Sequence, residues 1–235
     1  MPGQLSQGQE CRLDPADSHK LRTVLRAAVG EFVEVRDSTA AVFECVILGL
    51  LPEVTVRLER RCEQPAMTEL AISLAQCLPK GSKMDYVVEK ATELGVIRFL
   101  PVQSERVIGA REGTGKLDRW RRLARAAAAQ SGALAIPEVS EVVDWSGLLA
   151  LMPGYDRVLI PWEIAPTKPR ALDALVNGAS SVLVVIGPEG GLSYREIERA
   201  QAVGAQTLSL GRRILRSETA GLVAISAIRY AAGEV

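Results

Sequence analysis

A glycine-rich loop in the last quarter of the chain carries the residues best suited to bind a small ligand. Gly187-Pro188-Glu189-Gly190-Gly191 follows the apolar run Val182–Ile186. Glycine lets the main chain approach a ligand closely, whereas the carboxylate of Glu189 would repel phosphate. These residue types indicate a neutral or cationic ligand with hydroxyl and amino groups rather than a polyphosphate.

The residues around this loop predict the elements that position it. Val182–Ile186 is β-branched and apolar, which is typical of a strand buried on both faces. Ser193 and Glu196 have the spacing of a capping box, so a helix is expected to begin there. The loop is therefore expected at the carboxyl end of a strand, where open α/β sheets bind ligands.

The loop matches neither of the common nucleotide-binding motifs. Its glycines do not have the G-x-G-x-x-G spacing of a dinucleotide site, and Pro188 interrupts them. No lysine followed by serine or threonine completes a phosphate-binding P-loop after it. The sequence thus argues against a nucleotide-dependent dehydrogenase and against a kinase.

Composition limits the class of protein further. The 235 residues are 48% apolar, which suffices for one large domain or two small ones. No apolar run reaches the roughly 20 residues that cross a bilayer, and the polar start Met1–Asp17 has no signal-peptide core. With one histidine and four scattered cysteines, we expect reduced thiols, no metal, no membrane contact and a cytoplasmic location.

The net charge is zero, but the positive charges are clustered. One cluster comprises Lys116, Arg119, Arg121, Arg122 and Arg125. A local patch can contact nucleic acid phosphates even in a neutral protein, although such a cluster is more typical of the solvated face of a helix. An aromatic content of 4% argues against modules that stack bases, such as the RRM.

The first part of the chain has the alternating pattern of β-strands. The expected elements are strands at Phe32–Val35, Ala41–Leu48 and Val54–Leu58, preceded by one helix over Ser18–Ala28. This arrangement indicates a small β-barrel or sandwich. Gln64-Pro65 then has the composition of a linker.

The rest of the chain alternates strands with helices, which predicts a mostly parallel sheet. The expected strands are Leu70–Leu74, Val96–Leu100, Val158–Ile160, Val182–Ile186 and Thr207–Leu210. The expected helices are Met84–Leu94, Lys116–Gln130 and Ser217–Ala232. Gly95 should end the first of them. Small apolar residues lie on nearly every face of the last helix, so we expect it to be deeply buried.

Several short motifs, in order along the chain, resemble one known family. They are Lys80-Gly-Ser-Lys-Met-Asp85 with Glu89–Gly95, Ser104-Glu105-Arg106, Gln130-Ser131-Gly132, Gly187–Gly191 and Leu210–Ala220. Together they resemble the bacterial small-subunit (16S) ribosomal RNA (uracil-N3)-methyltransferases of the SPOUT class. The resemblance begins at about His19, and the last two motifs are highly specific.

The resemblance implies a fold and a cofactor. It implies a PUA-like β-barrel for RNA binding in residues 1–66, and a SPOUT α/β domain with a trefoil knot and a mostly parallel sheet in residues 67–235. It also implies a homodimer and S-adenosyl-L-methionine as methyl donor. The residues that it implies for the donor pocket are Gly187, Glu189, Gly190, Gly191, Leu210, Gly211, Ile214, Leu215 and Ala220.

The implied reaction is transfer of the donor methyl group to N3 of a uridine in small-subunit ribosomal RNA. That nitrogen carries a proton, so the site must remove it or stabilise the anion that forms. Arg106 and Arg216 match motif positions and are candidates to oppose this charge. Glu218 could position the donor or an arginine, or be an acid favoured at a helix N-terminus. His19 is a weak candidate base, because local packing at a helix start explains it more simply.

The resemblance also implies contacts with ribosomal RNA or the small ribosomal subunit. The candidate residues are Arg22, Arg26, Lys80, Lys83 and Gln130. Lys80 and Lys83 could contact phosphate, or could belong to an ordinary solvated loop. Lys90 and Glu93 have the spacing of a surface ion pair. The uridine must be presented unstacked, which favours a loop or single-stranded segment of folded RNA.

The sequence departs from the family pattern in two places. Ala133 stands where an arginine is usual, and Met1–Gln9 lacks the usual arginine and aromatic residue. Two alternatives therefore stay open: a catalytically silent RNA-binding homologue, and a methyltransferase for another RNA such as tRNA. Donor binding without methyl transfer would favour the first, and the identity of the methylated RNA would decide the second.

Overall fold

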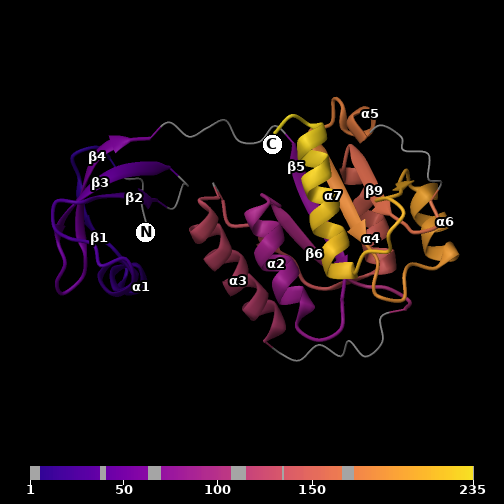
Figure 1. The fold of residues 1–235 in the computed structure, drawn as a ribbon, viewed down its shortest axis with the longest axis horizontal. Helices are drawn as coiled ribbons and strands as arrows, with labels where there is room; N and C mark the ends of the chain where they lie inside the picture. The colour runs from indigo at the N-terminus through magenta and orange to yellow at the C-terminus, as the bar shows by residue number, and fades with distance from the viewer. Residues whose placement is uncertain are drawn as a thin grey trace. The chain divides into compact units, whose positions relative to one another are not determined.

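Figure 1 shows the fold of the chain as a computed structural model. The structure describes residues 6–37, 41–62, 70–106, 115–133, 135–165 and 172–234. The expected linker Gln64-Pro65 lies outside these ranges. Contacts divide the chain into two compact units, Met1–Met67 and Thr68–Val235, and each has a hydrophobic core of its own.

The first unit is built on a four-stranded antiparallel sheet. Its strands are β1 (Glu10–Arg12), β2 (Phe32–Arg36), β3 (Val42–Gly49) and β4 (Thr55–Arg61), in the order β1-β4-β3-β2. Alternate residues of β3 and β4 fill its core, among them Cys45, Ile47, Val56 and Leu58. The three expected strands are confirmed, whereas β1 is too short to show alternation in the sequence. The PUA-like identity of this unit stays a prediction.

The helix expected over Ser18–Ala28 is placed differently. α1 covers Pro15–His19 and continues as a π-helical turn, η1 (Lys20–Val24). It begins earlier because the Asp14 carboxylate caps it and accepts a 2.8 Å backbone hydrogen bond from the first turn. It ends earlier, and the chain then takes a left-handed backbone at Arg26, with φ of 52°. The expected boundaries are therefore wrong at both ends.

The second unit is built on a parallel sheet. Its strands are β5 (Ala71–Cys77), β6 (Arg98–Gln103), β7 (Glu138–Val139), β8 (Val143–Asp144), β9 (Arg157–Pro161), β10 (Ser181–Ile186) and β11 (Gln206–Leu208). They lie in the order β11-β9-β10-β5-β6-β7, with β8 beside β6, and each described pair is parallel. The expected α/β class with a mostly parallel sheet is confirmed. The trefoil knot stays a prediction.

Helices cover both faces of this sheet (Figure 1). They are α2 (Lys83–Glu93), α3 (Lys116–Ser131), α4 (Trp145–Leu151), α5 (Leu172–Val176), α6 (Tyr194–Ala202), α7 (Ser217–Ala231) and the short 3-10 turn η2 (Met152–Gly154). Along β10, Val182, Val184 and Ile186 share a core with α2, α3, α5 and α7. Leu183 and Val185 share the opposite core with α4 and α6. β10 is therefore the doubly buried strand that its apolar run predicts.

α7 departs from the expectation of deep burial. One face of this helix is buried against the sheet and includes Gly221, Ala224, Ile225 and Ile228. The opposite face is open in the single chain, where Tyr230 is 75% exposed. The small apolar residues all round this helix therefore do not correspond to burial on every side, and that expectation is wrong for one copy of the chain.

The cysteines are free thiols, and two of them, Cys45 and Cys77, lie in the hydrophobic cores. Burial raises the pKa of both thiols to about 12. They therefore stay protonated and unreactive at neutral pH. Within the described ranges, no cluster of potential ligand residues could hold a metal ion, and no helix combines the length and apolar character needed to span a membrane.

Candidate active site

The loops that follow β5, β6, β9, β10 and β11 leave the same edge of the sheet, because these strands are parallel. The glycine-rich loop follows β10 and is closed by a 2.9 Å hydrogen bond from the Gly191 N–H to the Pro188 carbonyl. The expected capping box then starts α6. Ser193 Oγ accepts from the Glu196 N–H, and the Glu196 carboxylate accepts from the Ser193 N–H. The expected order of strand, loop and capped helix is confirmed.

Side chains from two other loops crowd the glycine-rich loop. A Cβ on Gly191 would lie 2.7 Å from a carboxylate oxygen of Glu163, and the φ of this glycine, +69°, is left-handed. A Cβ on Gly190 would lie 3.5 Å from the Cβ of Arg106. Glu163 belongs to the loop after β9 and Arg106 to the loop after β6. The glycine-rich loop thus runs between an acid and an arginine.

Lys83 joins the glycine-rich loop to the start of α7. Its Nζ atom lies 3.1 Å from Glu189 Oε1 and 3.2 Å from Glu218 Oε2. Hydrogen bonds to Glu189 and Glu218 raise the pKa of Lys83. Partial burial works to raise the pKa of Glu189, but hydrogen bonds from its own N–H, from the Lys80 N–H and from Lys83 lower it overall. Lys83 is therefore a bridge between two carboxylates and not a free cation.

The two arginines expected at the site are held differently. Arg106 Nη1 donates a 2.9 Å hydrogen bond to the Gly190 carbonyl, so its guanidinium is fixed beside the glycine-rich loop. Arg216 is 80% exposed and lies 4.0 Å from Glu218 Oε1, whereas the Glu218 side chain is only 14% exposed. The structure therefore brings Arg106, Arg216 and Glu218 to one edge of the sheet and leaves Arg216 the freest of them.

The residues expected in the donor pocket between Leu210 and Ala220 differ in burial. Leu210 and Ala220 pack against the core of the unit, and Leu210 lines an apolar recess among β9, β10, β11 and α7. Leu215 is half-buried, and Gly211 has a left-handed φ of +110° with open space where a Cβ would stand. Ile214 is 91% exposed, so its side chain does not line a pocket in the single chain.

The residues of the second unit that were expected to bind RNA do not all lie at this edge. The Lys80 N–H and the Lys83 ammonium both contact Glu189. Gln130 is exposed near the other end of α3. That helix begins beside the start of α2, where Arg119 pairs with Asp85 at 2.7 Å. Gln130 is eleven residues beyond Arg119, roughly 16 Å along the helix axis. The chain therefore separates Gln130 from the lysines.

The candidates of the first unit make local contacts. Arg22 donates 3.3 Å hydrogen bonds to the Ser18 and Pro52 carbonyls. Arg26 is exposed. His19 Nδ1 lies 3.3 Å from the Thr23 hydroxyl, one helical turn away. This contact agrees with local packing as the role of His19.

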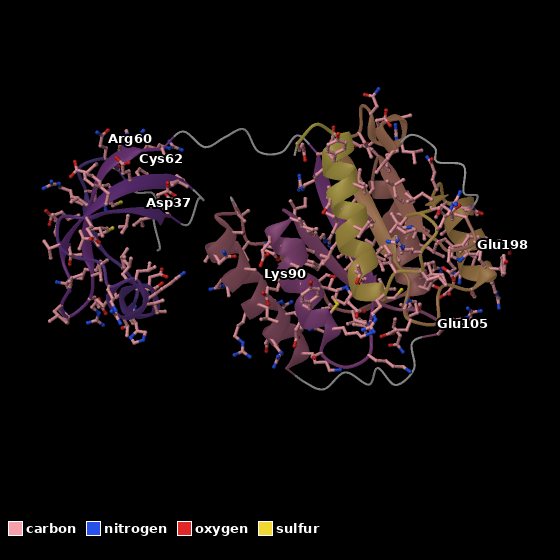
Figure 2. The ribbon with its side chains drawn as sticks, in the orientation of Figure 1. Asp37, Arg60, Cys62, Lys90, Glu105 and Glu198 are labelled. Atoms are coloured by element: carbon pink, nitrogen blue, oxygen red, sulfur yellow. The ribbon has the colours of Figure 1, made fainter. Side chains whose placement is uncertain are left out.

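The sequence pattern does not reveal a second set of contacts at the edge. The Glu105 N–H donates to Glu196 Oε1, and the Glu105 carboxylate accepts from Ser193 Oγ, each at 2.9 Å. The rings of Trp162 and Tyr194 meet edge to face at 5.1 Å. Figure 2 shows Glu105 on the loop after β6 and Glu198 on α6. The one sequence signal for Glu105 is its place in the motif Ser104-Glu105-Arg106.

Comparison with known proteins gives the class of enzyme to which the chain is similar. A family model described as an RNA methyltransferase domain matches residues 66–229. The ribosomal RNA small subunit methyltransferase E of Bacillus subtilis is 37% identical over 169 residues, which are 68% of this chain and 66% of that protein. The protein of the same name from Mycobacterium tuberculosis is 31% identical over 225 residues, which are 92% of this chain and 84% of that protein.

Solved structures agree with these sequences. A ribosomal RNA small subunit methyltransferase E from Neisseria gonorrhoeae, bound to S-adenosyl methionine, has a TM-score of 0.84 at 29% identity, and covers 98% of this chain and 95% of that one. A methyltransferase from Legionella pneumophila, in complex with the same cofactor, has a TM-score of 0.79 at 29% identity over the same shares of both chains. The chain belongs to the ribosomal RNA small subunit methyltransferase E family.

The residues of this chain fit the cofactor of those two structures. Gly190 is exposed, so a ligand can approach the main chain of the glycine-rich loop there. Glu218 Oε2 is buried and lies 3.2 Å from the Lys83 ammonium, and a carboxylate oxygen can accept a further hydrogen bond, here from a ligand amino group. Glu163 and Glu189 add negative charge that suits a cationic ligand.

Proposed function

We propose that the chain, as a cytoplasmic enzyme, transfers a methyl group from S-adenosylmethionine to N3 of a uridine in small-subunit ribosomal RNA. The observation that carries the proposal is the 2.9 Å hydrogen bond between Arg106 and the Gly190 carbonyl. It keeps a positive charge beside the loop of the proposed donor pocket. The names of the family model and of the relatives support RNA as the substrate class.

The donor pocket that we propose is formed by the glycine-rich loop, the segment Leu210–Leu215 and the start of α7. Gly187, Gly190 and Gly191 would present main-chain groups, and Glu189 and Glu218 would oppose the positive charges of the donor. When bound, S-adenosylmethionine supplies the methyl group from a positively charged sulfur. Gly211 and Ala220 would leave room for its adenosine part.

The reaction replaces the N3 proton of the uridine with a methyl group. The bond from N3 to the methyl carbon forms, the bond from that carbon to sulfur breaks, and the proton passes to solvent. Loss of the proton puts negative charge on N3 and on the two ring carbonyl oxygens. Arg106 and Arg216 would stabilise this charge, because a guanidinium donates charge-assisted hydrogen bonds to such oxygens. Arg106 is held in place already, whereas Arg216 is free to close on the base.

We further propose that the enzyme is a homodimer that grips RNA with both units. The exposed side chains of Ile214, in the loop before α7, and of Tyr230, in the last turn of α7, support a partner subunit on this part of the second unit. Lys80, Arg22 and Arg26 are the proposed phosphate contacts, and Gln130 a more distant one. Light scattering on the purified chain tests the dimer, which a monomeric mass would exclude.

The central experiment measures methyl transfer from labelled S-adenosylmethionine to small ribosomal subunits that lack this modification. Mass spectrometry then identifies the modified nucleoside, and 3-methyluridine in small-subunit RNA is the expected product. Donor binding without any methyl transfer would contradict the enzyme and favour the silent RNA-binding homologue. Transfer to tRNA alone would contradict the ribosomal substrate.

Variants at the two arginines test their roles. Arg106→Ala should lower kcat by about 10²-fold, the usual cost of removing one donor that stabilises transition-state charge. Arg216→Ala should act in the same direction. Arg199→Ala is the matched control, since Arg199 is an exposed arginine of α6 that lies outside the proposed pocket. Equal losses in all three variants would point to general RNA affinity and contradict the proposed roles.

A further inference from the structure

The capping-box residue Glu196 has two hydrogen-bond partners, and only one of them belongs to the cap. Its side chain is buried in the loops at the carboxyl edge of the sheet. Oε2 accepts a 2.8 Å hydrogen bond from the Ser193 N–H, which is the capping contact. Oε1 accepts a 2.9 Å hydrogen bond from the Glu105 N–H, in the loop after β6. One carboxylate therefore joins two loops that are far apart in the sequence.

The cap hydroxyl makes the same connection in the opposite direction. Ser193 Oγ accepts from the Glu196 N–H at 3.2 Å and donates to Glu105 Oε2 at 2.9 Å. The start of α6 thus holds Glu105 at both its main chain and its side chain. A helix cap alone requires neither contact, so these two hydrogen bonds have a consequence beyond the stability of α6.

These two hydrogen bonds affect the position of Arg106, the residue that follows Glu105. Its main chain is fixed from one side by the bond between Glu105 and Glu196. Its guanidinium is fixed from the other side by the Gly190 carbonyl at 2.9 Å. Gly190 and Ser193 belong to the same turn between β10 and α6. The place of Arg106 relative to the glycine-rich loop therefore depends in part on Glu196, which holds the main chain of the loop after β6.

We propose that Glu196 is a positioning residue for the reaction, which aims Arg106 at the acceptor base through Glu105. The proposal rests on the proposed function, in which Arg106 stabilises the uridine anion. Catalysis is sensitive to small displacements of such groups, and a shift of about 1 Å can cost up to 10²-fold in rate. Glu196 itself touches neither donor nor acceptor.

A double-mutant cycle separates this role from simple stability. Glu196→Gln keeps the size of the side chain but leaves one acceptor oxygen for two N–H groups. We expect it to lower kcat about tenfold, with the KM for the donor changed less than about twofold. In the Arg106→Ala background the same substitution should lower kcat no further, because the group that it aims is gone. Equal effects of Glu196→Gln in both backgrounds would overturn the proposal.

Asp144→Ala is the matched control. Asp144 caps α4 by accepting a 2.7 Å hydrogen bond from the Gly147 N–H, and its cap does not join the glycine-rich loop to another. It should leave kcat within about twofold of the parent. Ser193→Ala provides a second test if Glu196→Gln does not fold, since it removes the bond to the Glu105 carboxylate and should also lower kcat.

Amide hydrogen exchange tests the hydrogen bond between Glu105 and Glu196 without any enzyme turnover. Glu196→Gln should speed exchange at the Glu105 amide at least tenfold, whereas Asp144→Ala should not change it. Unchanged exchange at Glu105 would overturn the positioning proposal whatever the enzyme methylates. If exchange at Glu105 is faster in Glu196→Gln but the parent protein transfers no methyl group to RNA, the proposed function is contradicted. The hydrogen bond between Glu105 and Glu196 is then still supported.

Discussion

Helices α2 and α7 pack side by side and are joined at both ends, by two ionic clamps of different construction. At the first turns of both helices, the Lys83 ammonium lies between the carboxylates of Glu189 and Glu218. At the last turns, Arg229 donates to the Leu94 and Gly95 carbonyls at 2.6 and 2.7 Å and pairs with Glu234. The two helices are therefore parallel.

The two clamps differ in burial and in what they hold. The Lys83 side chain is 34% exposed, and its partners among the described residues are side-chain carboxylates, which can rearrange around a ligand. Arg229 is 5% exposed and donates hydrogen bonds to main-chain carbonyls, which cannot rearrange around a ligand in this way. The comparison indicates that the Arg229 clamp stabilises the unit, whereas the Lys83 clamp shapes the proposed donor pocket. Stability and ligand binding should therefore respond to different substitutions on the same helix pair.

Arg229→Ala should have the largest effect on stability. It leaves Glu234 and two carbonyls without their partner in a nearly dry environment, and loss of one member of a buried pair costs about 3–5 kcal/mol. The melting temperature should fall by about 10 °C. Donor affinity of the folded fraction, measured by calorimetry at low temperature, should be unchanged.

Arg199→Ala is the control for Arg229→Ala, because Arg199 makes one exposed side-chain hydrogen bond, to Ser146. A melting temperature within about 2 °C of the parent is expected for this control. If Arg229→Ala melts like the control, the buried clamp does not stabilise the unit and the contrast between the two clamps fails.

Gly95→Ala should have an intermediate effect. Gly95 has a φ of +78°, and its added Cβ would lie 2.7 Å from Arg229 Nη2. The left-handed backbone alone costs about 1–2 kcal/mol, and the guanidinium must also shift. Gly204→Ala isolates the second contribution, since Gly204 has a φ of +98° and nothing within 4 Å of the added atom. Equal melting temperatures for the two variants would show that the Arg229 guanidinium shifts away from the added Cβ with no loss of stability.

Lys83→Ala should weaken donor binding and barely change stability. Two carboxylates lose the cation between them, so the glycine-rich loop is released from α7. We expect the Kd for S-adenosylmethionine to rise about fivefold, the upper range for a partly exposed pair. Lys90→Ala is matched, because Lys90 also pairs with two carboxylates on α2, Glu89 and Glu93.

Figure 2 shows Lys90 away from the loop that carries Glu105, so its loss should leave the Kd unchanged. The two lysine variants should melt within about 3 °C of the parent. A large loss of stability in Lys83→Ala, or an equal change of Kd in both variants, would contradict the proposal that the Lys83 clamp serves the donor pocket and the Arg229 clamp serves stability.

The pH dependence of the Lys83 clamp should be the smallest effect. Because the pKa of Glu189 is lowered from its usual 4.5, its contribution to stability is present above pH 4.5 and is lost as pH falls through the lowered pKa. The pKa of Lys83 is raised above 10.5, so its contribution persists up to that pH and is lost as pH rises through the raised pKa.

The measurement is the difference in melting temperature between the parent and Lys83→Ala at a series of pH values. The difference should be constant from pH 6 to 9 and should shrink below pH 4.5. A difference that persists unchanged well below pH 4.5 would mean that the charge of Glu189 plays no part in the clamp.

Local features of the site could be predicted from the sequence because each is set by neighbouring residues. The strand before the glycine-rich loop and the capping box of Ser193 with Glu196 are examples, and both are confirmed. The end of α2 at Gly95, in a left-handed backbone, is another. The ion pair of Lys90 with Glu93, at 2.8 Å, follows from a spacing of three on one helix.

Contacts between distant segments could not be predicted in the same way. Nothing in the local pattern distinguishes Lys83 from Lys80, yet only Lys83 reaches Glu218. Arg229 resembles the basic residue of any last helical turn, although it is buried. The second partner of Glu196 depends on the loop after β6 arriving at α6, which the parallel sheet alone determines.

The register of the central strands also governs how the unit can form during synthesis. β10 pairs with β5 along its whole length, from Ser181 opposite Ala71 to Ile186 opposite Gln76. At about 5–20 residues per second, the ribosome needs roughly 5 to 20 seconds to make the segment between them. Until then β5 keeps an unpaired, apolar edge of the kind that invites aggregation. A nascent chain of this protein should therefore depend on a chaperone between the appearance of β5 and that of β10.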